Sequence, residues 1–186
     1  CEMCIRDSYR TSNAGVIVNL GIATPIGSGG HADGDQLSGI EGLFGSAFVD
    51  RLTGDGGDNR LEGNDGTDTL VGAAGADILR GGAGNDSLVG GEGADELDGG
   101  ADIDTVDYNG STLGVTVDLT QVGPATGGDA AGDLLSGVEN IVGSGADDVL
   151  TAGNGVNVLT GGLGDDTLTG GDGGDTLTGG GGVNDT

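Results

Sequence analysis

Aspartate recurs every nine residues through much of the chain, in blocks that are otherwise rich in glycine. Residues 81–89 read GGAGNDSLV and residues 90–98 read GGEGADELD, so aspartate comes sixth and leucine eighth. The same phase runs over 45–107 and again over 143–186, where the last block is incomplete. The chain therefore repeats an oxygen-donating side chain at fixed spacing, a pattern that suits binding of hard cations. The sixth positions are Asp50, Asn59, Asp68, Asp77, Asp86, Asp95, Asp104, Asp148, Asn157, Asp166, Asp175 and Asn184.

The composition is acidic and poor in large side chains. The 186 residues include 46 glycines, no tryptophan, 31 acidic residues and five arginines, for a formal net charge of −26. Such a charge repels nucleic acid and anionic membranes, which excludes both as partners. Composition alone would also be compatible with disorder. The strict order of the residues argues against disorder and for a repeat architecture.

Each nine-residue block is long enough for one short strand and one turn. The last three residues of a block, such as SLV, predict a strand with its leucine facing a core, and the six glycine-rich residues predict the turn. Two blocks then make one coil of about 18 residues, and stacked coils pair their strands. Leu70, Leu88 and Val106 would stack on one side, and Leu61, Leu79 and Leu97 on the other. The predicted fold is therefore all-β, a parallel β-solenoid with a thin apolar core.

This stacking places aspartates one coil apart along the same edge. Two carboxylates about 5 Å apart repel by roughly 3 kcal/mol at an effective dielectric constant near 20. A divalent cation between the turns would reverse the sign of this interaction. Calcium suits the site because it accepts about six to eight oxygens in loose geometry, whereas Mg²⁺ keeps its waters and Zn²⁺ prefers nitrogen and sulfur ligands. We expect several Ca²⁺ ions, first at Asp68/Asp86, Asp77/Asp95 and Asp86/Asp104, then at Asp148/Asp166, and last between Asp166 and the incomplete final block.

Glycine carbonyls can turn inward to complete such a ligand set, because no side chain obstructs them. The candidate backbone ligands are Gly63, Gly66, Gly72, Gly75, Gly81, Gly82, Gly84, Gly90, Gly91, Gly93, Gly161, Gly162, Gly164, Gly170, Gly171 and Gly173.

The blocks resemble the nonapeptide G-G-x-G-x-D-x-U-x of repeats-in-toxin (RTX) proteins, a known calcium-binding parallel β-helix motif. Four blocks fit at every fixed position: GGAGNDSLV, GGEGADELD, GGLGDDTLT and GGDGGDTLT. The resemblance implies a right-handed β-roll, secretion through a type I apparatus without an N-terminal signal peptide, and folding outside the bacterial cell. Some blocks depart from the motif: asparagine replaces aspartate at Asn59, Asn157 and Asn184, GSAFVDRLT carries Phe48 and Val49 in its turn, AGNGVNVLT lacks its first glycine, and GGADIDTVD carries Asp102 instead of its third.

The chain contains two copies of one larger module. Residues 34–72 align without gaps to 132–170, and 9–20 align to 108–119. We expect a first module at 9–107, with spacer strands at 9–44 and the array at 45–107. The second spans 108–186, with spacer strands at 108–142 and a truncated array at 143–186. Residues 1–8 lack a counterpart in this scheme and are expected to be a non-native leader.

An apolar run at 15–27 resembles a signal-peptide core, but its twin lies in mid-chain where no signal peptide acts. We interpret it as a strand in both copies, with Val16, Val18 and Leu20 facing the core. No stretch is long enough to predict a membrane span.

Other functional patterns are weaker. The Cys1–Cys4 pair has no partner motif for zinc, His31 is the sole histidine, and acidic pairs such as Asp165/Asp166 fall in phase with the turns instead of forming a glycosidase dyad. Threonine does not recur at one turn position, as an ice-binding surface would need. We therefore expect this chain to be no enzyme but a calcium-binding module of a secreted bacterial protein. The alternatives are the C-terminal tail of a secreted protease or lipase whose catalytic domain lies elsewhere, and an adhesin stalk.

Overall fold

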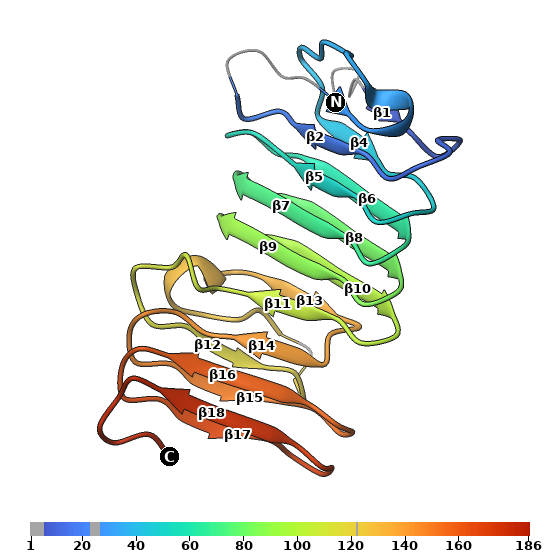
Figure 1. The fold of residues 1–186 in the computed structure, drawn as a ribbon. Helices are drawn as coiled ribbons and strands as arrows, with labels where there is room; N and C mark the ends of the chain where they lie inside the picture. Colours follow the sequence, from blue (N-terminus) through green and yellow to red (C-terminus); the bar gives the residue numbers. More distant parts are fainter. Residues whose placement is uncertain (1–5, 23–26, 122) are drawn as a thin grey trace.

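The structure, a computed structural model, describes residues 6–22, 27–121 and 123–186. It is almost entirely built of short β-strands stacked along one axis, with two short 3₁₀ helices, η1 (Gly30–Ala32) and η2 (Gly128–Ala130) (Figure 1). Nearly all strand pairs are parallel, which confirms the all-β solenoid. The strands are β1 (Arg6–Ser8), β2 (Ile17–Asn19), β3 (Gly27–Ser28), β4 (Gly42–Phe44), β5 (Arg51–Thr53), β6 (Arg60–Asp65), β7 (Thr69–Ala74), β8 (Ile78–Ala83), β9 (Ser87–Glu92), β10 (Glu96–Ala101), β11 (Thr105–Asp107), β12 (Thr116–Asp118), β13 (Leu134–Ser136), β14 (Asn140–Val142), β15 (Val149–Thr151), β16 (Val158–Gly162), β17 (Thr167–Thr169) and β18 (Thr176–Gly180).

Strands in the arrays begin where the sequence predicted, and most of them run further; β5, β11, β15 and β17 keep the predicted three residues. β7 starts at Thr69, the seventh residue of its block, and continues through the first three residues of the next block. These extra residues stay in the ladder because they pair with the coil above: Ala73 lies opposite Gly91. The turn at 75–77 between β7 and β8 is therefore three residues long, and there the expected six-residue turn was wrong. Six residues do separate β5 from β6, β15 from β16 and β17 from β18, as expected.

Leucines at the eighth position form the core. Leu70 pairs with Leu88 in one sheet and Leu61 pairs with Leu79 in the other, as the repeat predicted. All four are fully buried, whereas the side chains on either side of them along a strand are partly exposed. Each buried leucine contributes about 2 kcal/mol of apolar burial. The core is thus one side chain deep on each side, and it positions the turns between the two sheets.

Three sheets carry the stack. Their strand orders are β1-β4-β6-β8-β10-β13, then β18-β16-β14-β11-β9-β7-β5-β2-β3, and finally β12-β15-β17. The second module continues the first directly, because β13 pairs with β10 and β14 pairs with β11. The right-handedness of the coil remains a prediction.

The spacer strands lie where the apolar runs predicted. Val16 and Val18 are fully buried and Leu20 is nearly so, while Ile17 between them is exposed. In the second copy Val117 is also fully buried. The inward-facing alternation in β2 and β12 is therefore confirmed.

The expected leader lies only partly within the described residues. Cys1 and Cys4 fall outside them. Residues 6–8 form β1 and pair with β4 (Arg6 opposite Gly42), as β11 pairs with β14 in the second module. These three residues therefore belong to the fold, and the expectation that they lack a counterpart was wrong. Among the described residues, no helix is long and apolar enough to cross a membrane.

Candidate metal centre

The sixth-position aspartates form two ladders of carboxylates along the edges of the solenoid. Asp86 Oδ1 accepts a hydrogen bond from the backbone N–H of Asp68 at 2.7 Å, and Asp104 Oδ1 accepts one from Asp86 at 2.8 Å. On the opposite edge Asp95 Oδ1 accepts from Asp77 at 2.8 Å. Each bond joins residues eighteen positions apart. The structure thus stacks these aspartates one coil over the next, as their spacing predicted.

The second oxygen of these carboxylates is buried and has no hydrogen-bond partner. This holds for Oδ2 of six aspartates, all of which lie inside the arrays. A buried carboxylate oxygen without a donor is strongly unfavourable, because it has lost water and gained nothing in exchange. A cation beside such an oxygen would supply the missing partner. The six residues are Asp68, Asp77, Asp86, Asp95, Asp104 and Asp166.

Glycine at the first position of the blocks that carry these aspartates makes room beside their oxygens. A Cβ on Gly81 would clash with Asp86 Oδ2 and would lie 2.5 Å from the carbonyl oxygen of Gly99 in the next coil. The carboxylate and a carbonyl from two successive coils therefore crowd the same small space. Glycine is the one residue that permits this approach.

Burial raises the pKa of these carboxyl groups. The pKa of Asp68 rises to about 7, chiefly through loss of water, with smaller contributions from the charges of Asp50 and Asp86. Burial likewise raises the pKa of Asp77 and of Asp104 to about 6. The backbone N–H donors oppose this shift only in part. The charged ladder is thus unfavourable by itself, and a bound dication would relieve it.

The donor set fits a hard cation. In the part of the chain that the structure describes, no three acidic, histidine or cysteine side chains converge on one point. A cation at these turns would therefore be held by one or two carboxylate oxygens together with backbone carbonyls. An all-oxygen set of this kind suits Ca²⁺ and does not suit Zn²⁺ or Cu²⁺.

Sequence reasoning missed three side chains that extend the ladders. Asp133 and Glu139, both in the second spacer, accept the backbone N–H groups of Asp95 and Asp104, each at 2.9 Å. The duplicated motif GDxLSGxE, which contains both residues in each copy, was the available signal. At the C-terminal end Asp185 Oδ1 accepts from Asp166 at 3.1 Å, in the place expected for Asn184. Asn184 instead donates to Asp165, because the final block has one extra residue before its aspartate.

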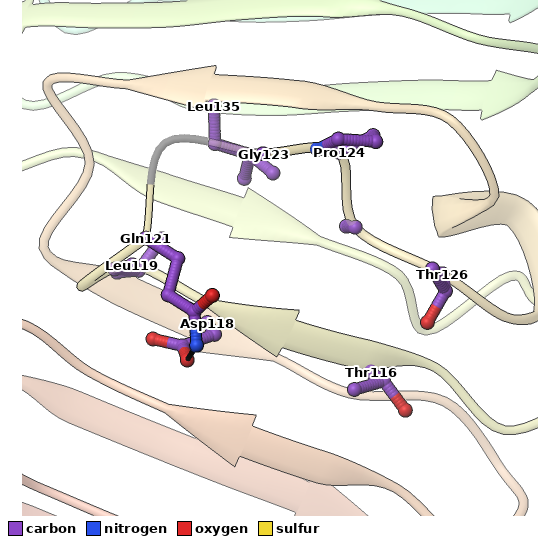
Figure 2. Close-up of a pocket in the computed structure, with 9 residues that line it drawn as sticks. Thr116, Asp118, Leu119, Gln121, Gly123, Pro124, Thr126 and Leu135 are labelled. Carbon is purple, nitrogen blue, oxygen red and sulfur yellow. Dashed lines mark hydrogen bonds between the residues drawn. The ribbon is translucent and has the colours of Figure 1, made fainter.

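A cavity of about 220 Å³ lies beside β12 in the second spacer (Figure 2). Among the described residues that line it, Asp118 is the only acidic one, and Thr120 and Gln121 donate to that carboxylate at 2.6 and 2.8 Å. The Thr120 hydroxyl, with further help from Gln121, lowers the pKa of Asp118, so its carboxylate is a poor proton acceptor. This cavity brings no nucleophile and base together. Its lining is Thr116, Asp118, Leu119, Gln121, Gly123, Pro124, Ala125, Thr126 and Leu135.

The fold is a parallel β-solenoid, and its turns carry the all-oxygen donor set that hard cations prefer. A model of the RTX calcium-binding nonapeptide repeat family matches the chain in four copies, at residues 44–79, 71–106, 135–168 and 151–185. These matches cover more than half of the chain, which therefore belongs to this family. RTX nonapeptide repeats bind Ca²⁺, and the repeat is a structural element, not a catalytic one. A comparison with curated proteins found no match.

Proposed function

We propose that this chain is a calcium-dependent β-roll module of a secreted bacterial protein, and that it folds when calcium binds outside the cell. The observation that carries the proposal is the set of buried, unpartnered Oδ2 atoms along both ladders. In the absence of a cation these oxygens oppose folding. In its presence they favour it.

The proposed ligands are the six aspartates with unpartnered oxygens and the glycine carbonyls beside them. For a single site with a Kd of about 10⁻⁴ M, typical of tighter extracellular modules, about 2 mM calcium contributes roughly 2 kcal/mol. Several such sites together match the ~5–15 kcal/mol that separates a folded domain from its unfolded chain. Binding and folding are thus coupled, and partial occupancy leaves the chain unfolded.

This coupling suits export. RTX proteins are typically secreted, and a type I apparatus is the partner that the family implies. Where calcium is scarce, the net charge of −26 keeps the chain extended and able to pass through a narrow exporter. Extracellular calcium then neutralises the ladders and drives folding.

A calcium titration followed by far-UV circular dichroism tests the proposal. The chain should lack β-sheet signal in chelator and gain it cooperatively as Ca²⁺ rises through the sub-millimolar range. Mg²⁺ at equal ionic strength is the control for simple charge screening, and it should restore much less signal. A β-sheet spectrum that is identical in chelator and in calcium would refute the proposed function.

A further inference from the structure

The aspartates of the two ladders are not all alike. Asp50 and Asp148, which belong to the first block of each array, have no unpartnered carboxylate oxygen. In the first array the Ser46 hydroxyl lies 2.9 Å from Asp50 Oδ1, and the Ser46 N–H donates to Oδ2 at 2.5 Å. In the second array the Ser144 hydroxyl lies 2.8 Å from Asp148 Oδ1, and its N–H donates to Oδ2 at 2.7 Å. The same arrangement thus occurs independently in both copies.

The backbone at the second position of the block explains the difference. In the interior blocks whose sixth residue is aspartate, this residue has a left-handed backbone, for example at Gly82 (φ 120°) and Gly162 (φ 115°), and the aspartates with a buried Oδ2 receive no N–H bond there. Ser46 and Ser144 stand at this position in the first blocks and have negative φ, so their N–H groups point to the carboxylate. The serine thus supplies two donors where the interior blocks of Asp68, Asp77, Asp86, Asp95, Asp104 and Asp166 supply none to Oδ2.

A matching arrangement ends the first array. Asp133 continues the ladder by accepting the N–H of Asp95, but its Oδ2 accepts a hydrogen bond from the Tyr108 hydroxyl at 2.9 Å. Tyr108 is 2% exposed and Asp133 is fully buried. In the first copy Tyr9 occupies the equivalent position, and its hydroxyl lies 2.6 Å from Asp7 Oδ2 and 3.2 Å from Asp35 Oδ2. At Asp133 a tyrosine O–H therefore stands where an interior aspartate has no partner.

We propose that these serine and tyrosine donors close the calcium ladders, so that calcium binds in the array interiors and not at Asp50, Asp133 or Asp148. Because the donors satisfy both carboxylate oxygens, a cation gains little there and would have to displace formed hydrogen bonds. The spacers then divide the solenoid into separate calcium-binding runs joined by junctions that need no metal. This inference rests on the proposed function and specifies which turns carry it out.

The test is calcium stoichiometry, measured by equilibrium dialysis with ⁴⁵Ca²⁺ on the full chain, with β-sheet content checked by circular dichroism. Asp50→Asn, Asp133→Asn and Asp148→Asn should each leave the number of bound ions unchanged. Asp86→Asn, which is the interior counterpart, should lower it by at least one. If any of the three junction variants loses an ion as Asp86→Asn does, the inference is overturned.

A gain of binding tests the same inference from the opposite direction. Ser144→Gly gives the first block of the second array the double glycine of an interior block, and it should add one bound ion. Ser136→Gly is the matched control, since the hydroxyl of that exposed serine bonds Asp98 and the residue lies in β13, outside the turns. An unchanged stoichiometry in folded Ser144→Gly would overturn the inference. A wild-type chain that binds no calcium would instead overturn the proposed function, so the two failures are distinguishable.

Discussion

Replacing Asp86 by asparagine should change the stability of the fold in opposite directions with and without calcium. Asparagine keeps the size of the side chain and an oxygen to accept the N–H of Asp68, as Asp86 Oδ1 does at 2.7 Å. It removes the negative charge and replaces the unpartnered Oδ2. The chain already carries asparagine in this position at Asn59 and Asn157, so the substitution is compatible with the turn.

The magnitudes follow from the ladder. Without calcium, Asp86 repels Asp68 and Asp104, each about one coil away, by roughly 3 kcal/mol per fully charged pair at an effective dielectric constant near 20. At pH 8 Asp68 and Asp104 are mostly ionised, so Asp86→Asn should stabilise the calcium-free fold by up to about 6 kcal/mol. With calcium at 100 times Kd, each lost site removes about 2.7 kcal/mol. Asp86 faces a neighbour on both sides, so the loss should be about 3–5 kcal/mol.

Two titrations measure these effects. In chelator at pH 8, a stabilising osmolyte folds the chain, and Asp86→Asn should need less osmolyte than the wild type. In 10 mM calcium, the urea midpoint of Asp86→Asn should be lower than that of the wild type. Asp172→Asn removes one charge from an exposed aspartate and is the matched control, with a small effect in both conditions. A change of the same sign in both conditions would refute the electrostatic reasoning.

Three further predictions concern the turns and the pH dependence of the carboxylate ladders. Ala73 has φ 91° at a position where most blocks carry glycine, so Ala73→Gly should raise the free energy of unfolding in calcium by about 1 kcal/mol in urea denaturation. Gly84 has φ 119°, and a Cβ there would collide with the carbonyl oxygen of Gly66. Gly84→Ala should therefore lower the free energy of unfolding in calcium by about 2–3 kcal/mol. An unchanged urea midpoint would contradict the close approach of these coils. The raised pKa values of Asp68 (about 7) and Asp104 (about 6) mean that the folded chain binds more protons than the unfolded chain between about pH 4 and pH 7. In chelator, the free energy of unfolding should therefore rise by up to about 1.4 kcal/mol per group and pH unit as the pH falls from 7 to 5, while the calcium concentration at the folding midpoint rises. Circular dichroism that shows acid destabilising the calcium-free fold would contradict this sign.

The sequence predicted the stack and its register because two signals agreed. The nine-residue period fixed which leucines pair, and Leu70 does lie opposite Leu88. The aspartates followed from the same period, since Asp68 and Asp86 occupy equivalent positions in successive coils. Strand length was underestimated for β6 to β10, β16 and β18 because glycine was taken as a turn residue, whereas the residues that open the next block stay in the ladder there.

The ends of the ladders could not be predicted from the period, because the residues that form them break it. Asp133 lies 38 residues beyond Asp95, and Glu139 lies 35 residues beyond Asp104, instead of eighteen. Only the folded spacer brings them into place. Ser144 was visible in the sequence, but its role depends on a backbone angle that the residue type alone does not set.

A crystal structure of the chain grown in calcium, with ions located by long-wavelength anomalous scattering, tests the central claim most directly. We predict anomalous peaks about 2.3–2.6 Å from the Oδ2 atoms of the interior aspartates, Asp86 among them. Interior turns that are fully formed in calcium-rich buffer, with no peak beside those oxygens, would contradict the account.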